Sequence, residues 1–133
     1  NSGVIDDLIP AVLSVHRILV PKVDKFGNDV AGIRNPLVEA PIATLTGWNT
    51  RTPEFSAGHL CDLNGMTVPL FRTNMESREA GDPRPSLEEM YGDHEGYVKE
   101  IAGAAVALQK DRLMLDEDVI RFIFEAAERE VLK

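Results

Sequence analysis

The stretch DEDVIRFIFEAAEREVL, residues 116–132, decides the fold class of the C-terminal half of the chain. Its apolar side chains recur at helical spacing, with a stripe of four-residue steps and two larger side chains beside it: Val119, Ile123, Ala127 and Val131, with Ile120 and Phe124. Charged residues occupy the opposite face. Asp116 is the predicted N-cap, because a short carboxylate there accepts from the first free backbone N–H groups. The pattern predicts an amphipathic helix that buries one face.

Three more helices are predicted before this one. The strings TNMESREAG and SLEEMYG each place Thr or Ser three residues before Glu, which is the spacing of a capping box. Both strings end in Gly, the residue favoured just after a helix C-terminus. An apolar stripe in YVKEIAGAAVALQKDRL predicts a long helix that pairs with the last one as an antiparallel helical hairpin. Residues 71–133 are therefore predicted to be helical.

The first half of the chain is predicted to hold strands and loops. The apolar strings HRILVPKVD and DVAGIRNP flank the turn KFGN, which favours an N-terminal β-hairpin. APIATLTGW reads as a third short strand, and residues 50–70 as a long loop of a kind that is often functional. The predicted fold class is thus α+β in one domain, 1–133, with residues 1–70 forming strands and loops ahead of about four helices.

Composition and charge restrict the partners. The chain has 133 residues and a net charge of −8, of which residues 67–133 contribute −6. An acidic surface repels phosphate groups, so we expect neither nucleic acid nor a membrane as partner. The single cysteine forms no intrachain disulfide and no signal peptide is visible, which favours a cytoplasmic location.

No motif in the sequence specifies a catalytic centre, a metal or a cofactor. The P-loop, the dinucleotide fingerprint, HExxH, paired CxxC and the GxSxG nucleophile elbow all need spacings that do not occur. His16, His59 and His94 lie far apart in the sequence. Cys61 lies two residues after His59, so a Cys–His pair is geometrically available, although an inert thiol is the favoured interpretation. We expect no catalytic residue, no metal and no cofactor here.

Five residues are candidates for contact with a substrate or with another domain: Arg34, Trp48, Asn49, Arg51 and His59. The arginines lie in turn-like settings, where each pairs with a carboxylate of the chain or binds an acidic ligand. For Trp48 the favoured interpretation is a core position, with its indole N–H bonded to a carbonyl. The alternative is that Trp48 lines a pocket or a docking surface. His59 lies in the long loop, where functional residues concentrate.

Five strings in order resemble one family: LVPKVDKFGNDVAGIRNP, PIATLTGWNTRTPEF, LCDLNGMTVPLFRT, GDPRPSLEEMYG and HEGYV. Together they are similar to the C-terminal region of large bacterial and fungal proteins with an α/β-hydrolase domain. The resemblance runs from about Leu19 to the C-terminus. In that family the serine nucleophile lies in an elbow upstream of this region, so no catalytic residue carries over. Because the chain begins with Asn, we expect it to be a piece of a longer protein.

The resemblance implies a non-catalytic C-terminal accessory or cap module of a serine-type hydrolase that acts on an ester or a related acyl substrate. Its implied partner is the hydrolase core of the same parent protein. A stand-alone acidic binding or protein-interaction module is the alternative. A small enzyme that uses His59 with Cys61 is the third hypothesis, and a homo-oligomer also stays open.

Overall fold

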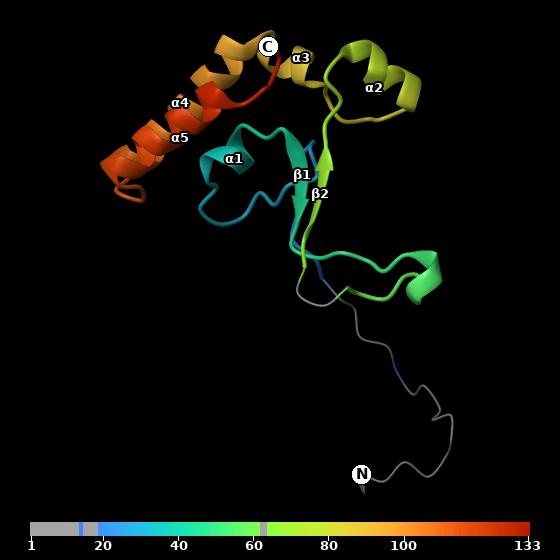
Figure 1. Cartoon of the computed structure of the whole chain (residues 1–133). Helices are drawn as coiled ribbons and strands as arrows, with labels where there is room; N and C mark the ends of the chain where they lie inside the picture. The colour runs from blue at the N-terminus through green and yellow to red at the C-terminus, as the bar shows by residue number, and fades with distance from the viewer. Residues whose placement is uncertain (1–13, 15–18, 62–63) are drawn as a thin grey trace, which may run out of the picture.

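The structure is a computed structural model, and it describes Ser14, residues 19–61 and residues 64–133. Figure 1 shows a pair of strands near the middle, a projecting connection at one end of them and helices at the other. The elements in chain order are α1 (Pro36–Glu39), β1 (Ala43–Thr46), the 3-10 helix η1 (Pro53–Phe55), β2 (Met66–Pro69), α2 (Asn74–Ala80), α3 (Leu87–Tyr91), α4 (His94–Lys110) and α5 (Asp116–Glu128). The α+β class is confirmed.

The sheet of the described residues is an antiparallel pair of β1 and β2, in which Ala43 lies opposite Pro69 and Thr46 opposite Met66. β1 is the predicted third strand. Its partner comes from the end of the segment predicted as a loop. Pro69 lies at the end of β2, where a missing N–H is tolerated because no further strand pairs with it.

The turn predicted at KFGN forms, but its flanks are not extended strands. Val23 and Asp29 make an isolated antiparallel bridge. The Asp24 carboxylate accepts from the backbone N–H of Asn28 at 3.0 Å, which closes the turn. Beyond it the chain cannot continue as a strand, because Asn35 caps α1 by accepting from the N–H groups of the first turn. The hairpin prediction is therefore corrected to a turn with one bridge, and residues 16–18 of its first arm lie outside the described residues.

Asn28 attaches this turn to the sheet. Its side chain is buried and spans two backbone groups of β1. Its amide Nδ2 donates to the carbonyl of Ala43 at 3.1 Å, and its Oδ1 accepts from the N–H of Leu45 at 2.6 Å. Asn28 thus takes the place of a third strand along the edge of β1, since it satisfies one donor and one acceptor there.

Arg84 attaches the helical half to the same sheet. Its side chain, which is mostly buried, pairs with Asp82 at 2.6 Å. The guanidinium also donates to the Thr44 hydroxyl at 2.8 Å and to the carbonyls of Val68 and Pro69 at 3.0 and 3.2 Å. Hydrogen bonds from Arg84 lower the pKa of Asp82. One planar cation therefore links the loop after α2 to both strands.

The four helices predicted in the second half are present. The capping box at Thr73 and Glu76 is complete in both directions. Ser86 caps α3 by accepting from the N–H of Glu89. The N-cap of α5 is Leu115 and not Asp116, which is the correction of a one-residue error in the predicted start. Asp116 instead lies in the first turn of the helix.

The apolar face of α5 differs from the predicted stripe. Val119 and Ala126 are buried against the rest of the core, whereas Ile120 and Phe124 are 69% and 62% exposed. A strict spacing of four drifts by about 40° per step around a helix of 3.6 residues per turn. Helix α4 runs alongside α5 in the opposite direction (Figure 1). The side chains of α5 that face α4 are therefore spaced alternately three and four residues apart.

The core of the described residues joins the turn at Phe26, the segment of α1 and β1, the end of β2 and the helices α3, α4 and α5. Its buried members are Phe26, Ala40, Leu70, Leu87, Tyr97, Ile101, Ala126 and Val131. Tyr97 and Ile101 on α4 are fully buried, so α4 is the element around which the others pack. Within the described part of the chain, no helix has the length and apolar character needed to cross a bilayer.

Candidate functional site

Four of the five predicted site residues lie on the connection between β1 and β2, residues 47–65, which we call the arm. The arm folds back on itself. The N–H of Arg51 donates to the carbonyl of His59, and the N–H of Cys61 donates to the carbonyl of Asn49, both at 2.9 Å. Figure 1 shows the arm projecting from the end of β1 and β2, with η1 at its tip. These bonds bring Asn49, Arg51 and His59 together in one short ladder.

Arg51 and His59 line one shallow hollow in the arm, together with Ser56, Gly58 and Leu60. Ser56 and Gly58 both have positive φ values, which turns the chain sharply beside η1. The hollow is open, and its side chains are exposed. It presents an imidazole and a guanidinium on the same face.

Trp48 is not a core residue. Its side chain is 54% exposed, and no described group accepts a hydrogen bond from its indole N–H. The expectation of a core position is therefore wrong. The reason is local: β1 ends at Thr46, so Trp48 lies beyond the sheet and away from the apolar cluster that α4 organises. Phe55 and Leu60 are also exposed on the arm.

Arg34 lies apart from the arm and is used within the fold. Its Nη2 is 2.7 Å from the Asp24 carboxylate and donates to the carbonyl of Val38 at 2.8 Å. Its Nε lies 2.8 Å from the Glu39 carboxylate. Burial raises the pKa of Asp24, but hydrogen bonds from Arg34 and from two backbone N–H groups outweigh it, so the net shift is downward. Of the two roles predicted for Arg34, the structure shows pairing with carboxylates of the chain.

The histidines do not converge among the described residues. Both ring nitrogens of His94 face backbone carbonyls at the C-terminal end of α5: Nδ1 is 2.9 Å from that of Val131 and Nε2 3.2 Å from that of Ala127. His59 is exposed on the arm, near the partly buried Cys61. His16 lies outside the described residues. Within the described ranges, no three His, Cys, Asp or Glu side chains lie close enough to hold a metal ion.

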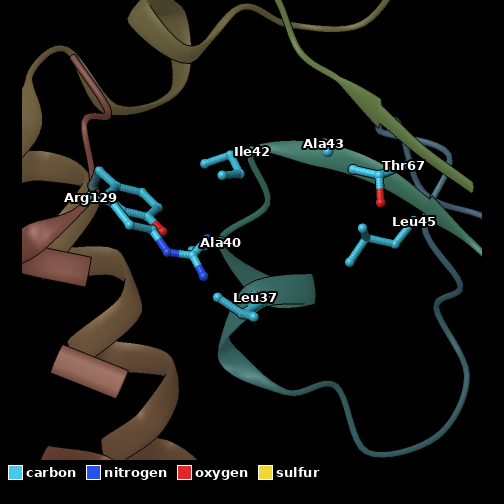
Figure 2. A pocket seen from close by; sticks show the side chains of 8 residues that line it. Leu37, Ala40, Ile42, Ala43, Leu45, Thr67 and Arg129 are labelled. Carbon is cyan, nitrogen blue, oxygen red and sulfur yellow. The ribbon is translucent and has the colours of Figure 1, made fainter. Parts of the chain in front are cut away.

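A second hollow, which the sequence did not reveal, lies between the segment of α1 and β1 and the helices α4 and α5 (Figure 2). Its volume is about 170 Å³. The walls are mostly apolar, and the lining residues are Leu37, Ala40, Ile42, Ala43, Leu45, Thr67, Tyr97 and Arg129. We call it the Tyr97 pocket. Its floor is buried, and its rim at Leu45 and Thr67 is exposed.

Tyr97 and Arg129 supply the polar groups of this pocket from the helical side. The Tyr97 hydroxyl is buried and has no hydrogen-bond partner in the described structure. Burial raises its pKa, and the nearby Arg129 guanidinium lowers it, with a net upward shift. The ring of Tyr91 meets that of Tyr97 edge-on, with centroids 5.3 Å apart, but the Tyr91 hydroxyl donates to the carbonyl of Pro41 at 2.8 Å. Of these two neighbouring tyrosines, Tyr97 alone has an unsatisfied hydroxyl.

A comparison with protein families gave a match over most of the chain. The model of the alpha/beta hydrolase domain matches residues 7–123. The chain belongs to the α/β-hydrolase domain family. Neither the comparison with curated proteins nor that with solved structures gave a match. The span that matches the α/β-hydrolase domain includes the arm and most of the Tyr97 pocket but ends before Arg129.

Proposed function

We propose that this chain is a non-catalytic accessory module that packs on the catalytic core of a serine-type α/β-hydrolase acting on an ester or related acyl substrate. Two facts about the chain support this proposal. The family match covers residues 7–123, and the sequence has no GxSxG elbow to supply a nucleophile. A member of a hydrolase family without that elbow needs its nucleophile from elsewhere in the protein.

The observation that carries the docking part is the exposed apolar surface of the arm. Trp48, Phe55 and Leu60 all present most of their side chains to solvent. Large apolar side chains grouped on one projecting segment are typical of an interaction surface, because burying them against a partner removes apolar area from water. Asn49, Arg51 and His59 lie along the same segment and provide a polar rim for that contact.

The catalytic part is tested with the purified chain and a fluorophosphonate probe that labels activated serines. We expect no labelling and no hydrolysis of p-nitrophenyl acetate above the buffer rate. Stoichiometric labelling of one serine would refute the non-catalytic assignment. Turnover that resists the probe but is abolished in Cys61→Ser would instead support the Cys–His hypothesis.

The docking part is tested with the hydrolase core encoded by the same gene. The variant Trp48→Ser with Phe55→Ser should weaken binding of the chain to that core at least about tenfold, since buried aromatic anchors dominate interfaces. Met75→Ser is the matched control, because Met75 is equally exposed but lies on α2. Equal loss in both variants would contradict docking through the arm. A gene that encodes only these residues would favour the stand-alone binding module.

A further inference from the structure

The Tyr97 pocket combines an apolar chamber with two hydrogen-bond donors. Leu37, Ile42 and Leu45 form its walls on the side of α1 and β1. Tyr97 closes it from α4, and Figure 2 shows Arg129 extending from the helical side toward Ala40. Small-molecule sites usually have this character, with apolar walls and a few polar groups that fix the orientation of the ligand.

The Tyr97 hydroxyl indicates that a polar ligand atom belongs in this pocket. The residue is fully buried, its hydroxyl has no hydrogen bond of good geometry among the described residues, and its polar neighbour Arg129 can only donate, so the hydroxyl proton has no acceptor. A buried hydroxyl without a partner is unfavourable, because it has given up its hydrogen bonds to water. An acceptor atom within the chamber would satisfy it.

Arg129 adds the charge. Among the described residues, no carboxylate lies within 4.0 Å of its side chain, although the chain is acidic overall. Arg34, Arg84 and Arg121, by contrast, each have a carboxylate partner. A guanidinium presents a planar fork of donors that matches a carboxylate, and a neighbouring hydroxyl donates to the same group. The two donors together select a carboxylate over a neutral ligand.

The size of the chamber limits the rest of the ligand. Its volume is about 170 Å³. An apolar cavity of about 150 Å³ admits a molecule the size of benzene. The tail is therefore an aliphatic chain of about four to six carbons, by the same comparison. Inorganic phosphate or sulfate would leave the apolar walls unused, and the tail of a long fatty acid would extend past the exposed rim at Leu45 and Thr67 into solvent.

We propose that the Tyr97 pocket binds a short-chain aliphatic monocarboxylate. The carboxylate accepts hydrogen bonds from Arg129 and Tyr97, and the aliphatic tail lies against Leu37, Ile42 and Leu45. This binding requires no nucleophile and no contact with a hydrolase core, so it stands independently of the proposed docking through the arm.

The test is a titration of the ¹⁵N-labelled chain with pentanoate, followed by amide chemical shifts and by calorimetry. We expect saturable binding with a Kd of about 1 mM or tighter, with the largest shifts at residues 37–45 and 97. Pentanol, which has the tail without the charge, should bind at least about tenfold more weakly, because the charge-assisted hydrogen bonds are lost. Acetate, which has the charge without the tail, should also bind more weakly.

Two variants with one matched control assign the contacts. Arg129→Gln and Tyr97→Phe should each weaken pentanoate binding, Arg129→Gln by about tenfold or more. Arg121→Gln is the control, since Arg121 lies on α5, the helix that Arg129 caps, carries the same charge and does not line the pocket. Tyr97→Phe should change the melting temperature of the ligand-free chain little, because the hydroxyl that it removes has no acceptor for its proton. A loss of binding in this variant would therefore not reflect unfolding.

Three results would overturn the proposal. The first is the absence of saturable shifts at the pocket with about 10 mM pentanoate, which would indicate that the chamber holds water only. The second is equal affinity for pentanol and pentanoate, which would remove the role of the carboxylate. The third is unchanged pentanoate affinity in Arg129→Gln, which would place binding elsewhere on the chain.

Discussion

Replacing Arg84 by Ala should destabilise the fold strongly, because this side chain joins the helical half to both strands. Two of its hydrogen bonds, to the Thr44 hydroxyl and the Val68 carbonyl, are partly buried and measure 2.8 and 3.0 Å. A hydrogen bond that involves a charged group contributes about 1.5 kcal/mol or more, so their loss amounts to about 3 kcal/mol. The ion pair with Asp82 disappears as well, and because both residues are only partly buried it adds about 1 kcal/mol at most, for a total of about 3–4 kcal/mol.

The assay is urea unfolding followed by circular dichroism at equilibrium. Arg84→Ala should lower the midpoint while the slope stays the same, because the surface exposed on unfolding is unchanged. Arg84→Lys should recover only part of the loss, since an ammonium group cannot reproduce the planar fork. Arg78→Ala is the matched control: it makes the same change in net charge on the exposed side of α2 and should cost less than about 0.5 kcal/mol. If Arg84→Ala were no more harmful than Arg78→Ala, the reasoning would be refuted.

Trp48→Ala should change the free energy of unfolding by less than about 1 kcal/mol in thermal melts, because the side chain is largely exposed; a loss of about 3–5 kcal/mol would show a core role. Asn28→Ala should cost about 2–3 kcal/mol in urea unfolding, because a buried carbonyl and a partly buried N–H of β1 lose their partners, and an unchanged midpoint would contradict this account. The folded-state pKa of Asp24 is lowered, so the ionised carboxylate adds to the free energy of unfolding above the unfolded-state pKa, and this gain is lost as the pH falls through the folded-state pKa. In Asp24→Asn the free energy of unfolding should therefore fall less steeply as the pH is lowered in this range, measured by urea unfolding at several pH values. The pKa values of Tyr91 and Tyr97 are raised, so stability should fall as the pH rises above about 10, and Tyr91→Phe should reduce that fall.

The sequence predicted best where local chemistry decides the structure. The capping box at Thr73 and Glu76 and the terminal Gly81 are local, because side chain and backbone partners lie within a few residues, and both are present. The turn at KFGN is local in the same sense and also forms. The flanking strands of that turn are not local, since they depend on what lies beside them. Asn28, a turn residue, bonds to β1 in place of a longer strand.

The Tyr97 pocket escaped prediction for a related reason. Helical periodicity puts Tyr97 in the apolar stripe of residues 97–113 and Arg129 on the charged side of residues 116–132. Only the packing of α4 and α5 with the segment of α1 and β1 brings the two side chains to one cavity. Periodicity shows which face of a helix is buried, but it does not show which buried hydroxyl lacks a partner. A tyrosine in a stripe otherwise made of small and aliphatic residues was the one available signal.

The arm has an evolutionary consequence. Closing a connection of about 20 residues instead of a turn of about four costs roughly 1.4 kcal/mol more in chain entropy. Most of the arm's large side chains face solvent and contribute little to the core, so the pairing of β1 with β2 gains nothing from this length. Relatives are thus free to shorten, lengthen or recompose the arm while the same core folds beneath it. A chimaera that exchanges only the segment between Gly47 and Gly65 should therefore keep its fold, while its docking partner would follow the origin of that segment.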